Sequence, residues 1–439
     1  MLQLQRSSQP CIAGCSLRRG IQAVAALIVL VVRYAQTASQ KPRRKVHLYT
    51  FSDTLPHPGL CVLAEATAEL GGILRVLGLS KKPGYLLIQS HSPTLKFIML
   101  QEVVEYEMSI GRIAADDLMI FVDGHDVLLQ RPLADLLAAY ERWPGSPYLI
   151  SGEKNCWPWP HSEPIHGKWD PGMAVNPNKT WVVNKYLQLG VRDFCRVVAR
   201  RGPYPYPNIG TSMGPVWRML EVLKRNNRIV LEEDMNDQGA MWLVILRHAV
   251  ELHIEIDQNA EVFMNMLQYE PGELEREPCV PGWFADAPSG NAGAAPQNGS
   301  KLAAPAALPP QNRMTKAVPA MLHFNGPSHE DSVWPSCFYA FSQQFRKTGK
   351  GHSFFDIDHN IQVSTDYICD YSFYKIRDFH AHPLNEQSLT FLEQFHQLPV
   401  DPGLLAWRGN ASAGDSVNFG TEADLYPDSH HLRKVMGMN

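Results

Sequence analysis

The sequence predicts an α/β fold with a mostly parallel central sheet. The chain has 439 residues, of which 45% are hydrophobic, so it is long enough to bury a large core. From residue 45 onward, strand-like apolar runs alternate with segments of helical periodicity. The run Leu118–Val122 is continuously apolar, as in a central parallel strand covered on both faces. Strand–helix–strand order of this kind favours a layered α/β domain.

Each element follows from a local pattern. Lys45–Thr50 alternates and is rich in β-formers, so it predicts the first strand. Cys61–Leu70 has helical spacing and ends at a pair of glycines, which predicts a helix, and Ile73–Leu79 predicts the second strand. Further along, the same criteria predict helices at 94–108, 132–140, 215–226 and 237–247, and strands at 118–122, 148–151 and 251–256.

The first 44 residues predict a secretory signal. Arg18 and Arg19 precede the apolar run Gly20–Val32. This run is shorter than the roughly 20 residues of a comfortable membrane helix. Three alternatives stay open: a cleaved signal peptide, a single-pass signal anchor with a basic stem, and a buried core helix. Entry into the secretory pathway is favoured, with the protein in the lumen of the endoplasmic reticulum or Golgi, either free or anchored in the type II orientation.

Composition divides the remainder of the chain. A main domain is predicted over residues 45–284 and resumes over 317–346. Between them, residues 285–316 are dominated by Ala, Pro, Gly, Asn and Ser, which predicts a disordered insertion. Residues 347–439 form a C-terminal tail to which the sequence assigns no role.

Charge and cysteine content exclude some classes. A net charge of -4 gives no basic surface for nucleic acid, so no nucleic-acid partner is expected. No Cys-x-x-Cys pair is present, which leaves little support for a zinc or thioredoxin-like site. In an oxidising lumen the cysteines can form disulfides, and Cys156 with Cys195 is one candidate pair.

The sharpest chemical pattern is the segment Phe121–Val127. Asp123 and Asp126 follow a buried strand, and ligands bind at the carboxyl ends of parallel strands. Two carboxylates in such a place suit Mg²⁺ or Mn²⁺ bound to a diphosphate. The alternative is that one aspartate caps a turn and the other is solvated.

Three further segments carry candidate chemistry. Pro207–Gly214 has small residues that allow close backbone approach to a ligand, or it is a plain loop. The acidic run Glu232–Gln238 supplies carboxylates for a reacting hydroxyl, or it caps a helix. The segment His323–Ser328 brings a histidine after an apolar strand, although a single histidine is more often structural.

Taken in order, these segments resemble a family: the glycosyltransferase domain of procollagen lysyl hydroxylases and the related collagen galactosyltransferases. Phe121–Val127 resembles the family's F-T-D-S-Y-D-V, and Asn208–Gly214 resembles N-S-G-G-x-x-G. Asp234–Gln238 is similar to its acidic segment ending in D-Q, and His323–Pro327 to H-G-N-G-P. The resemblance extends from about residue 45 to 328 and also includes Arg75–Leu79, Lys96, Glu153 and Cys156–Pro158. It implies a GT-A-like, Rossmann-like nucleotide-sugar-binding domain.

The resemblance also implies roles for individual residues. The metal ligands would be Asp123, Asp126 and His323. The UDP-sugar would be held by Thr50, His125, Gly326, His329 and Lys96. The catalytic carboxylates would be Asp237 and Asp234. The acceptor side would be formed by Trp157, Asn208 and Gly210.

The implied activity is transfer of a hexose from UDP-glucose or UDP-galactose to a hydroxyl of a hydroxylated protein residue or a glycan, with Mn²⁺ or Mg²⁺ as cofactor. Three departures from the family pattern, at Thr211, Asn236 and His329, leave the sugar and the acceptor open. The main alternative is a non-catalytic luminal module that binds sugar or protein. A metal-dependent phosphohydrolase is a weaker alternative, since no second metal cluster or nucleophile is evident.

Overall fold

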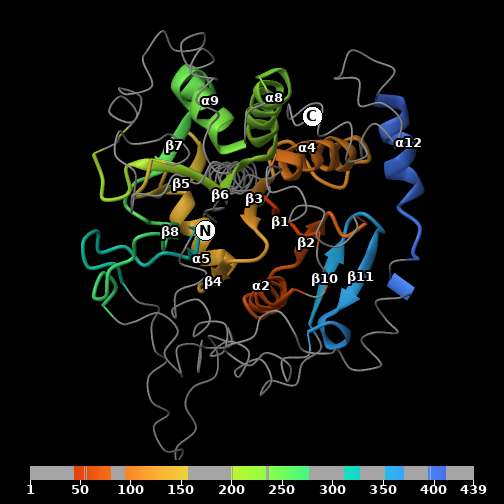
Figure 1. Ribbon diagram of the computed structural model, residues 1–439, viewed down its shortest axis with the longest axis horizontal. Helices are drawn as coiled ribbons and strands as arrows, with labels where there is room; N and C mark the ends of the chain where they lie inside the picture. Colours follow the sequence, from red (N-terminus) through yellow and green to blue (C-terminus); the bar gives the residue numbers. More distant parts are fainter. Residues whose placement is uncertain are drawn as a thin grey trace, which may run out of the picture. The chain divides into compact units, whose positions relative to one another are not determined.

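The computed structural model is an α/β domain built on a large, mostly parallel sheet (Figure 1). It describes residues 44–53, 55, 57–80, 94–156, 199, 201–233, 237–275, 311–326, 352–369, 394–395 and 397–411. Its strands are β1 (Val46–Phe51), β2 (Leu74–Leu77), β3 (Leu118–Asp123), β4 (Val127–Leu129), β5 (Tyr148–Glu153), β6 (Tyr206–Pro215), β7 (Ile254–Asp257), β8 (Phe263–Asn265), β9 (Met321–His323), β10 (Ser353–Asp356) and β11 (Ile361–Ser364). Its helices are α2 (Pro58–Glu69), α4 (Thr94–Ser109), α5 (Leu133–Tyr140), α8 (Val216–Glu233), α9 (Asp237–Leu252) and α12 (Pro402–Ala411), with a short 3-10 turn at Thr365–Tyr367.

The central sheet has eight strands in the order β11-β10-β2-β1-β3-β6-β5-β7. All of its strands run in the same direction except β6 and β11. A second sheet has three strands in the order β4-β9-β8. The two sheets meet where β3 ends and β4 begins, so the segment between them lies at the carboxyl edge of the central sheet.

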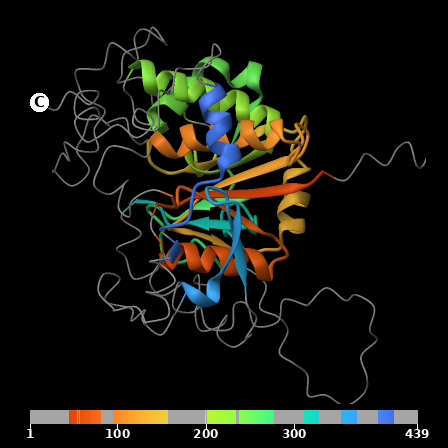
Figure 2. The ribbon, with the colours of Figure 1, turned by 90° about the vertical axis from the view of Figure 1, so that its right-hand side faces the viewer.

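Two hydrophobic cores cover the faces of the central sheet. On one face α4, α8 and α9 pack together, and Phe97, Phe121 and Trp242 belong to that core. On the other face lie α2, α5 and the second sheet, and Leu48, Val122 and Phe263 belong to that core. Figures 1 and 2 show these layers on opposite sides of the sheet. Because both faces are covered, β3 is apolar from Leu118 to Val122 and these residues are buried, as the sequence predicted.

Strand β6 contains the segment Pro207–Gly214, for which a loop was one of the two interpretations of the sequence, and the structure shows a strand there. Its Pro-, Gly- and Asn-containing sequence is poor in β-formers. It nevertheless runs antiparallel between β3 and β5 and is buried along nearly its whole length. Burial between two apolar strands outweighs local propensity here. The small residues allow the backbone of β6 to pass close to the side chains of Asp123 and His323.

The C-terminal region also contributes to the domain. Strands β10 and β11 extend the central sheet beside β2, although the sequence had assigned residues 347–439 no role. Asp358 fastens this segment, since its Oδ2 accepts hydrogen bonds from the backbone N–H groups of Gly78 at 3.1 Å and Ser80 at 3.0 Å. The folded part likewise includes residues 311–316 of the predicted insertion, where Asn312 is fully buried and donates to the Tyr204 hydroxyl at 2.7 Å.

A disulfide joins Cys61 on α2 to Cys369 after β11. It links cysteines 308 positions apart and so ties the C-terminal strands to the body of the domain. Cys156 is disulfide-bonded too, but Cys195 lies outside the described residues, so their pairing stays a prediction.

Removing the Cys61–Cys369 disulfide is expected to lower the free energy of unfolding by about 2–5 kcal/mol, because the unfolded chain regains the freedom that this long loop had lost. The measurement is urea unfolding of the Cys61→Ser/Cys369→Ser double variant beside the wild type. An unchanged unfolding midpoint would mean that the C-terminal strands are held without the covalent link.

None of the helices in the described part of the chain has the length and hydropathy of a membrane span. Residues 1–43 of the predicted signal segment 1–44 lie outside that part, as do residues 285–310 of the insertion and 327–346 of the resumed domain.

Candidate metal and nucleotide site

Three predicted metal ligands converge at the carboxyl edge of the central sheet. Asp123 ends β3, Asp126 directly precedes β4, and His323 ends β9. Pairing of β4 with β9 sets Val127 opposite His323, and the Phe324 N–H donates to the Asp126 carbonyl at 2.9 Å. A ligand atom from each of the three side chains lies within 4.8 Å of the others, so the group could hold a metal ion.

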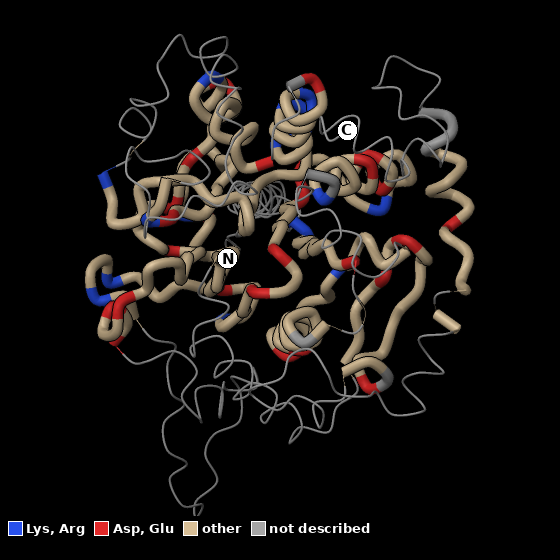
Figure 3. Tube along the Cα trace, viewed as in Figure 1, with Lys and Arg blue, Asp and Glu red and all other residues tan. Residues whose placement is uncertain are grey.

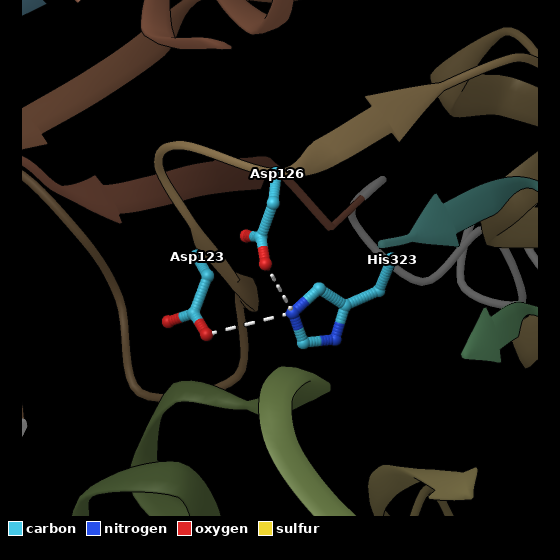
Figure 4. Close-up of side chains that lie close together, drawn as sticks. All are labelled: Asp123, Asp126 and His323. Atoms are coloured by element: carbon cyan, nitrogen blue, oxygen red, sulfur yellow. Dashed lines mark ion pairs between the residues drawn. The ribbon is translucent and has the colours of Figure 1, made fainter. Parts of the chain in front are cut away.

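The geometry within the group is compact (Figure 4). His323 Nε2 lies 3.2 Å from Asp126 Oδ2 and 3.6 Å from Asp123 Oδ2. Asp126 and His323 are buried, whereas the Asp123 side chain is 27% exposed. The ring thus faces both carboxylates, and the group is reached from the Asp123 side.

Two features fit this group to a cation. His323 Nδ1 is buried and has no hydrogen-bond partner among the described residues, and Nε2 meets the two carboxylates as ion-pair contacts without forming a hydrogen bond, an arrangement that normally costs free energy. Gly210 on β6 also lets the ring and a carboxylate approach the strand closely, since a Cβ there would lie 2.1 Å from His323 Cε1 and 2.6 Å from Asp123 Oδ2. One imidazole and two carboxylates suit Mn²⁺ or another first-row divalent ion.

Lys96 connects this group to a second carboxylate. From α4 its Nζ donates to Asp123 Oδ1 at 2.7 Å and lies 3.7 Å from Asp237 Oδ2. Burial alone would lower the pKa of Lys96, but Asp123 and Asp237 outweigh it and raise the pKa, so the ammonium stays charged. The lysine therefore stands as a fixed positive charge between the two carboxylates.

Asp237 begins α9 and is almost completely buried. Its Oδ1 accepts from the Gln238 N–H at 2.8 Å, while no described donor makes a hydrogen bond to Oδ2. Burial raises the pKa of Asp237, and the nearby Lys96 ammonium partly offsets this. A buried carboxylate with an unbonded oxygen beside a fixed cation can orient a hydroxyl group or accept its proton.

Three side-chain amides surround the Glu153 carboxyl, and one of them belongs to Gln238, the residue after Asp237. The Glu153 carboxyl, at the end of β5, accepts from Asn208 Nδ2 at 3.2 Å, Gln238 Nε2 at 2.9 Å and Asn325 Nδ2 at 3.0 Å. It therefore joins β5, β6, the start of α9 and the chain after β9. Burial raises the pKa of Glu153 to about 8, although the three amides favour its charged form.

The raised pKa of Glu153 makes the stability of the protein depend on pH. In the folded state the carboxyl keeps its proton up to about 8, whereas the unfolded chain releases it near 4.5. The unfolded state therefore binds fewer protons over this range, and the free energy of unfolding should fall as pH rises, by at most about 1.4 kcal/mol per pH unit.

Glu153→Gln cannot titrate, so its stability relative to the wild type should increase steadily between about pH 5 and about pH 8. Urea unfolding of both proteins across this range measures the difference. Other titrating groups such as Asp257, whose pKa burial raises to about 6, occur in both proteins and cancel. A stability difference that does not change with pH would contradict a raised pKa at Glu153.

The other predicted residues have separate outcomes. Thr50 is fully buried, and its hydroxyl donates to the Val122 carbonyl at 2.8 Å, just before the loop that joins β3 to β4. Its contact with uridine stays a prediction. Gly326 is exposed and has a φ of 64°, which glycine adopts without strain. Gly210 and Asn208, predicted on the acceptor side, lie against the metal group and in the Glu153 cluster respectively. The remaining predicted residues lie outside the described part: Asp234, Trp157 and His329.

His125 stands between the two metal-group aspartates in sequence. Its ring stacks on His57, with centroids 3.6 Å apart and planes 16° from parallel, and its Nε2 lies 3.0 Å from Ser52 Oγ. The sequence placed His125 against uridine but did not single out His57. In the Glu153 cluster, Gln238 and Asn325 lay inside motifs of the sequence analysis without an assigned role. Glu153 itself was noted only through the family resemblance.

Acidic and basic residues are interspersed over the described elements (Figure 3). The charge at the metal group and beside it therefore comes from its own side chains, chiefly Asp123, Asp126, Asp237 and Lys96. Comparison with known proteins adds no assignment: no family model matches the chain, and no curated protein matches it significantly.

Proposed function

We propose that the protein is a metal-dependent glycosyltransferase with a GT-A-like fold, which transfers glucose or galactose from a UDP-sugar to a hydroxyl group. The observation that carries the proposal is the arrangement of two neighbouring carboxylate positions with different surroundings. One is the Asp123–Asp126–His323 group, which could hold a metal ion, and the other is the buried Asp237. Lys96 lies between them.

Each part has a task in such a transfer. Asp123, Asp126 and His323 would hold Mn²⁺, or Mg²⁺, and the ion would neutralise charge on the UDP leaving group. Lys96 would add a fixed positive charge on the donor side. Asp237 would orient the acceptor hydroxyl and accept its proton, since its Oδ2 has no described hydrogen-bond donor. The Glu153 cluster would keep β5, β6 and α9 in register around the sugar.

The proposed acceptor is a hydroxylated protein residue or a glycan in the secretory pathway. Support for the compartment comes from the disulfide at Cys61–Cys369, because such bonds persist in oxidising environments. The predicted N-terminal signal agrees with it. This acceptor class is the one that the resemblance to the collagen glycosyltransferases implies.

Calorimetric titration of UDP in the presence and absence of Mn²⁺ tests the donor side. Wild type should bind UDP with Mn²⁺ and bind it much more weakly with EDTA. Asp126→Asn removes a charged ligand and should weaken UDP–Mn²⁺ binding by about 10-fold or more. Asp135→Asn is the matched control, because that carboxylate is half exposed on α5 and pairs with Arg131.

Two outcomes would count against the proposal in different ways. UDP affinity that does not depend on Mn²⁺ or on Asp126 would refute the metal site. UDP–Mn²⁺ binding without sugar transfer to any hydroxylated acceptor would favour the non-catalytic binding module.

A further inference from the structure

The start of α2 is pressed against the loop that carries Asp123 and Asp126. A Cβ on Gly59 would lie 1.8 Å from the His125 carbonyl oxygen, so only glycine fits at this position. One residue before the helix, the His57 ring stacks on the His125 ring. Helix α2 also packs on β4, which continues the same loop.

His125 is therefore held in three ways, twice at its ring and once at its backbone. One face lies on His57, Nε2 lies 3.0 Å from the Ser52 hydroxyl oxygen, and the backbone abuts Gly59. The ring is not a member of the Asp123–Asp126–His323 group, so its restraint does not serve metal binding directly. A flat ring fixed beside a group that could hold a metal ion is suited to stack on the base of a nucleotide bound there.

His57 is itself fixed by the helix that it begins. It is the N-cap residue of α2, and its Nδ1 accepts the Gly59 N–H at 3.1 Å. Because Nδ1 accepts this bond, the ring presents a set plane to His125. Ser, Thr, Asp and Asn are the usual N-cap residues, and all of them would satisfy this bond without providing a ring. Capping alone therefore does not account for a histidine here.

We propose that His57 is a positioning residue for nucleobase recognition, which holds the His125 ring in the plane that receives the uracil of UDP. The inference rests on the proposed function, because it requires UDP to bind beside Asp123 and Asp126. It makes the start of α2 part of the nucleotide site.

Two substitutions separate stacking from capping. His57→Phe keeps an aromatic ring and loses the cap, whereas His57→Asn keeps the cap and loses the ring. Affinities are measured by calorimetry for UDP with Mn²⁺ and for methylenediphosphonate with Mn²⁺, which has the diphosphate charge but no base. Thermal unfolding of each variant reports on the cap.

His57→Asn should retain the wild-type unfolding temperature but bind UDP–Mn²⁺ about 3- to 10-fold more weakly, the range expected for one lost aromatic contact. His57→Phe should unfold at a lower temperature yet bind UDP–Mn²⁺ within about 2-fold of the wild type. Neither substitution should alter methylenediphosphonate binding, because the metal group is unchanged.

The opposite pattern, with Asn retaining UDP affinity and Phe losing it, would show that His57 only caps the helix and would overturn the inference. Equal weakening of both probes in His57→Asn would overturn it too, since that result indicates disturbance of the metal group. Wild-type protein that binds methylenediphosphonate–Mn²⁺ but not UDP–Mn²⁺ would instead refute the proposed function, and the inference with it.

Discussion

Asp237→Asn is expected to lower the rate of sugar transfer by about 10²- to 10⁴-fold while leaving UDP–Mn²⁺ affinity near that of the wild type. Asp237 begins α9 and lies outside the Asp123–Asp126–His323 group, so the substitution removes no metal ligand. It does remove the carboxylate whose Oδ2 makes no hydrogen bond with a described donor. An amide of the same shape cannot take a proton from an acceptor hydroxyl.

Transfer rate and UDP affinity should be measured on the same preparation, with Asp135→Asn as a surface control. Thermal unfolding checks that loss of the negative charge beside Lys96 leaves the domain folded. Wild-type turnover in Asp237→Asn would show that this carboxylate has no part in the chemistry. A parallel loss of UDP binding would place it on the donor side instead.

Gly210→Ala is expected to weaken Mn²⁺ binding, and UDP binding with it, by about 10- to 100-fold. The added methyl group would lie 2.1 Å from His323 Cε1, far inside contact distance, and 2.6 Å from Asp123 Oδ2. The backbone of β6 cannot retreat easily, since it is paired with β3 on one side and β5 on the other. The imidazole and the carboxylate must therefore separate.

Gly214→Ala is the control on the same strand. Its Cβ would meet the Pro147 carbonyl oxygen at 3.0 Å, and Gly214 is paired with Met119 near the start of β3, away from the metal group at the end of β3. This variant should lose some stability but bind Mn²⁺ as the wild type does. Mn²⁺ titration followed by electron paramagnetic resonance distinguishes the two, and equal Mn²⁺ affinity in both variants would contradict the proposed placement of the ion.

Much of the fold could be predicted from local patterns. The first three strands and the helices α2, α4 and α5 were found within a few residues of their observed bounds, whereas α8 and α9 begin where predicted but continue past the predicted ends at 226 and 247 to Glu233 and Leu252. Strand β6 could not be found in this way, since its glycines and prolines are rare in strands and are typical of loops. Strands β10 and β11 are short, and β10 joins β2 across a large sequence separation, which no local pattern reveals.

The candidate site was predicted unevenly. Asp123, Asp126 and His323 were brought together through motif order and strand ends, and the structure confirms that the three side chains meet. The sequence could not show that Lys96 contacts both Asp123 and Asp237, or that three amides surround Glu153. Those contacts join segments that only tertiary folding brings together. The same holds for His57, whose contact with His125 depends on how α2 packs on β4.

A donor screen tests the central claim most directly. UDP release would be measured with UDP-glucose and UDP-galactose, each with Mn²⁺ or with EDTA, and with a hydroxylated peptide or glycan present or omitted. We predict Mn²⁺-dependent release from at least one of the two donors, stimulated by an acceptor, and abolished by EDTA. Release that is absent from both donors, or that is equally fast in EDTA, would contradict a metal-dependent hexosyltransferase.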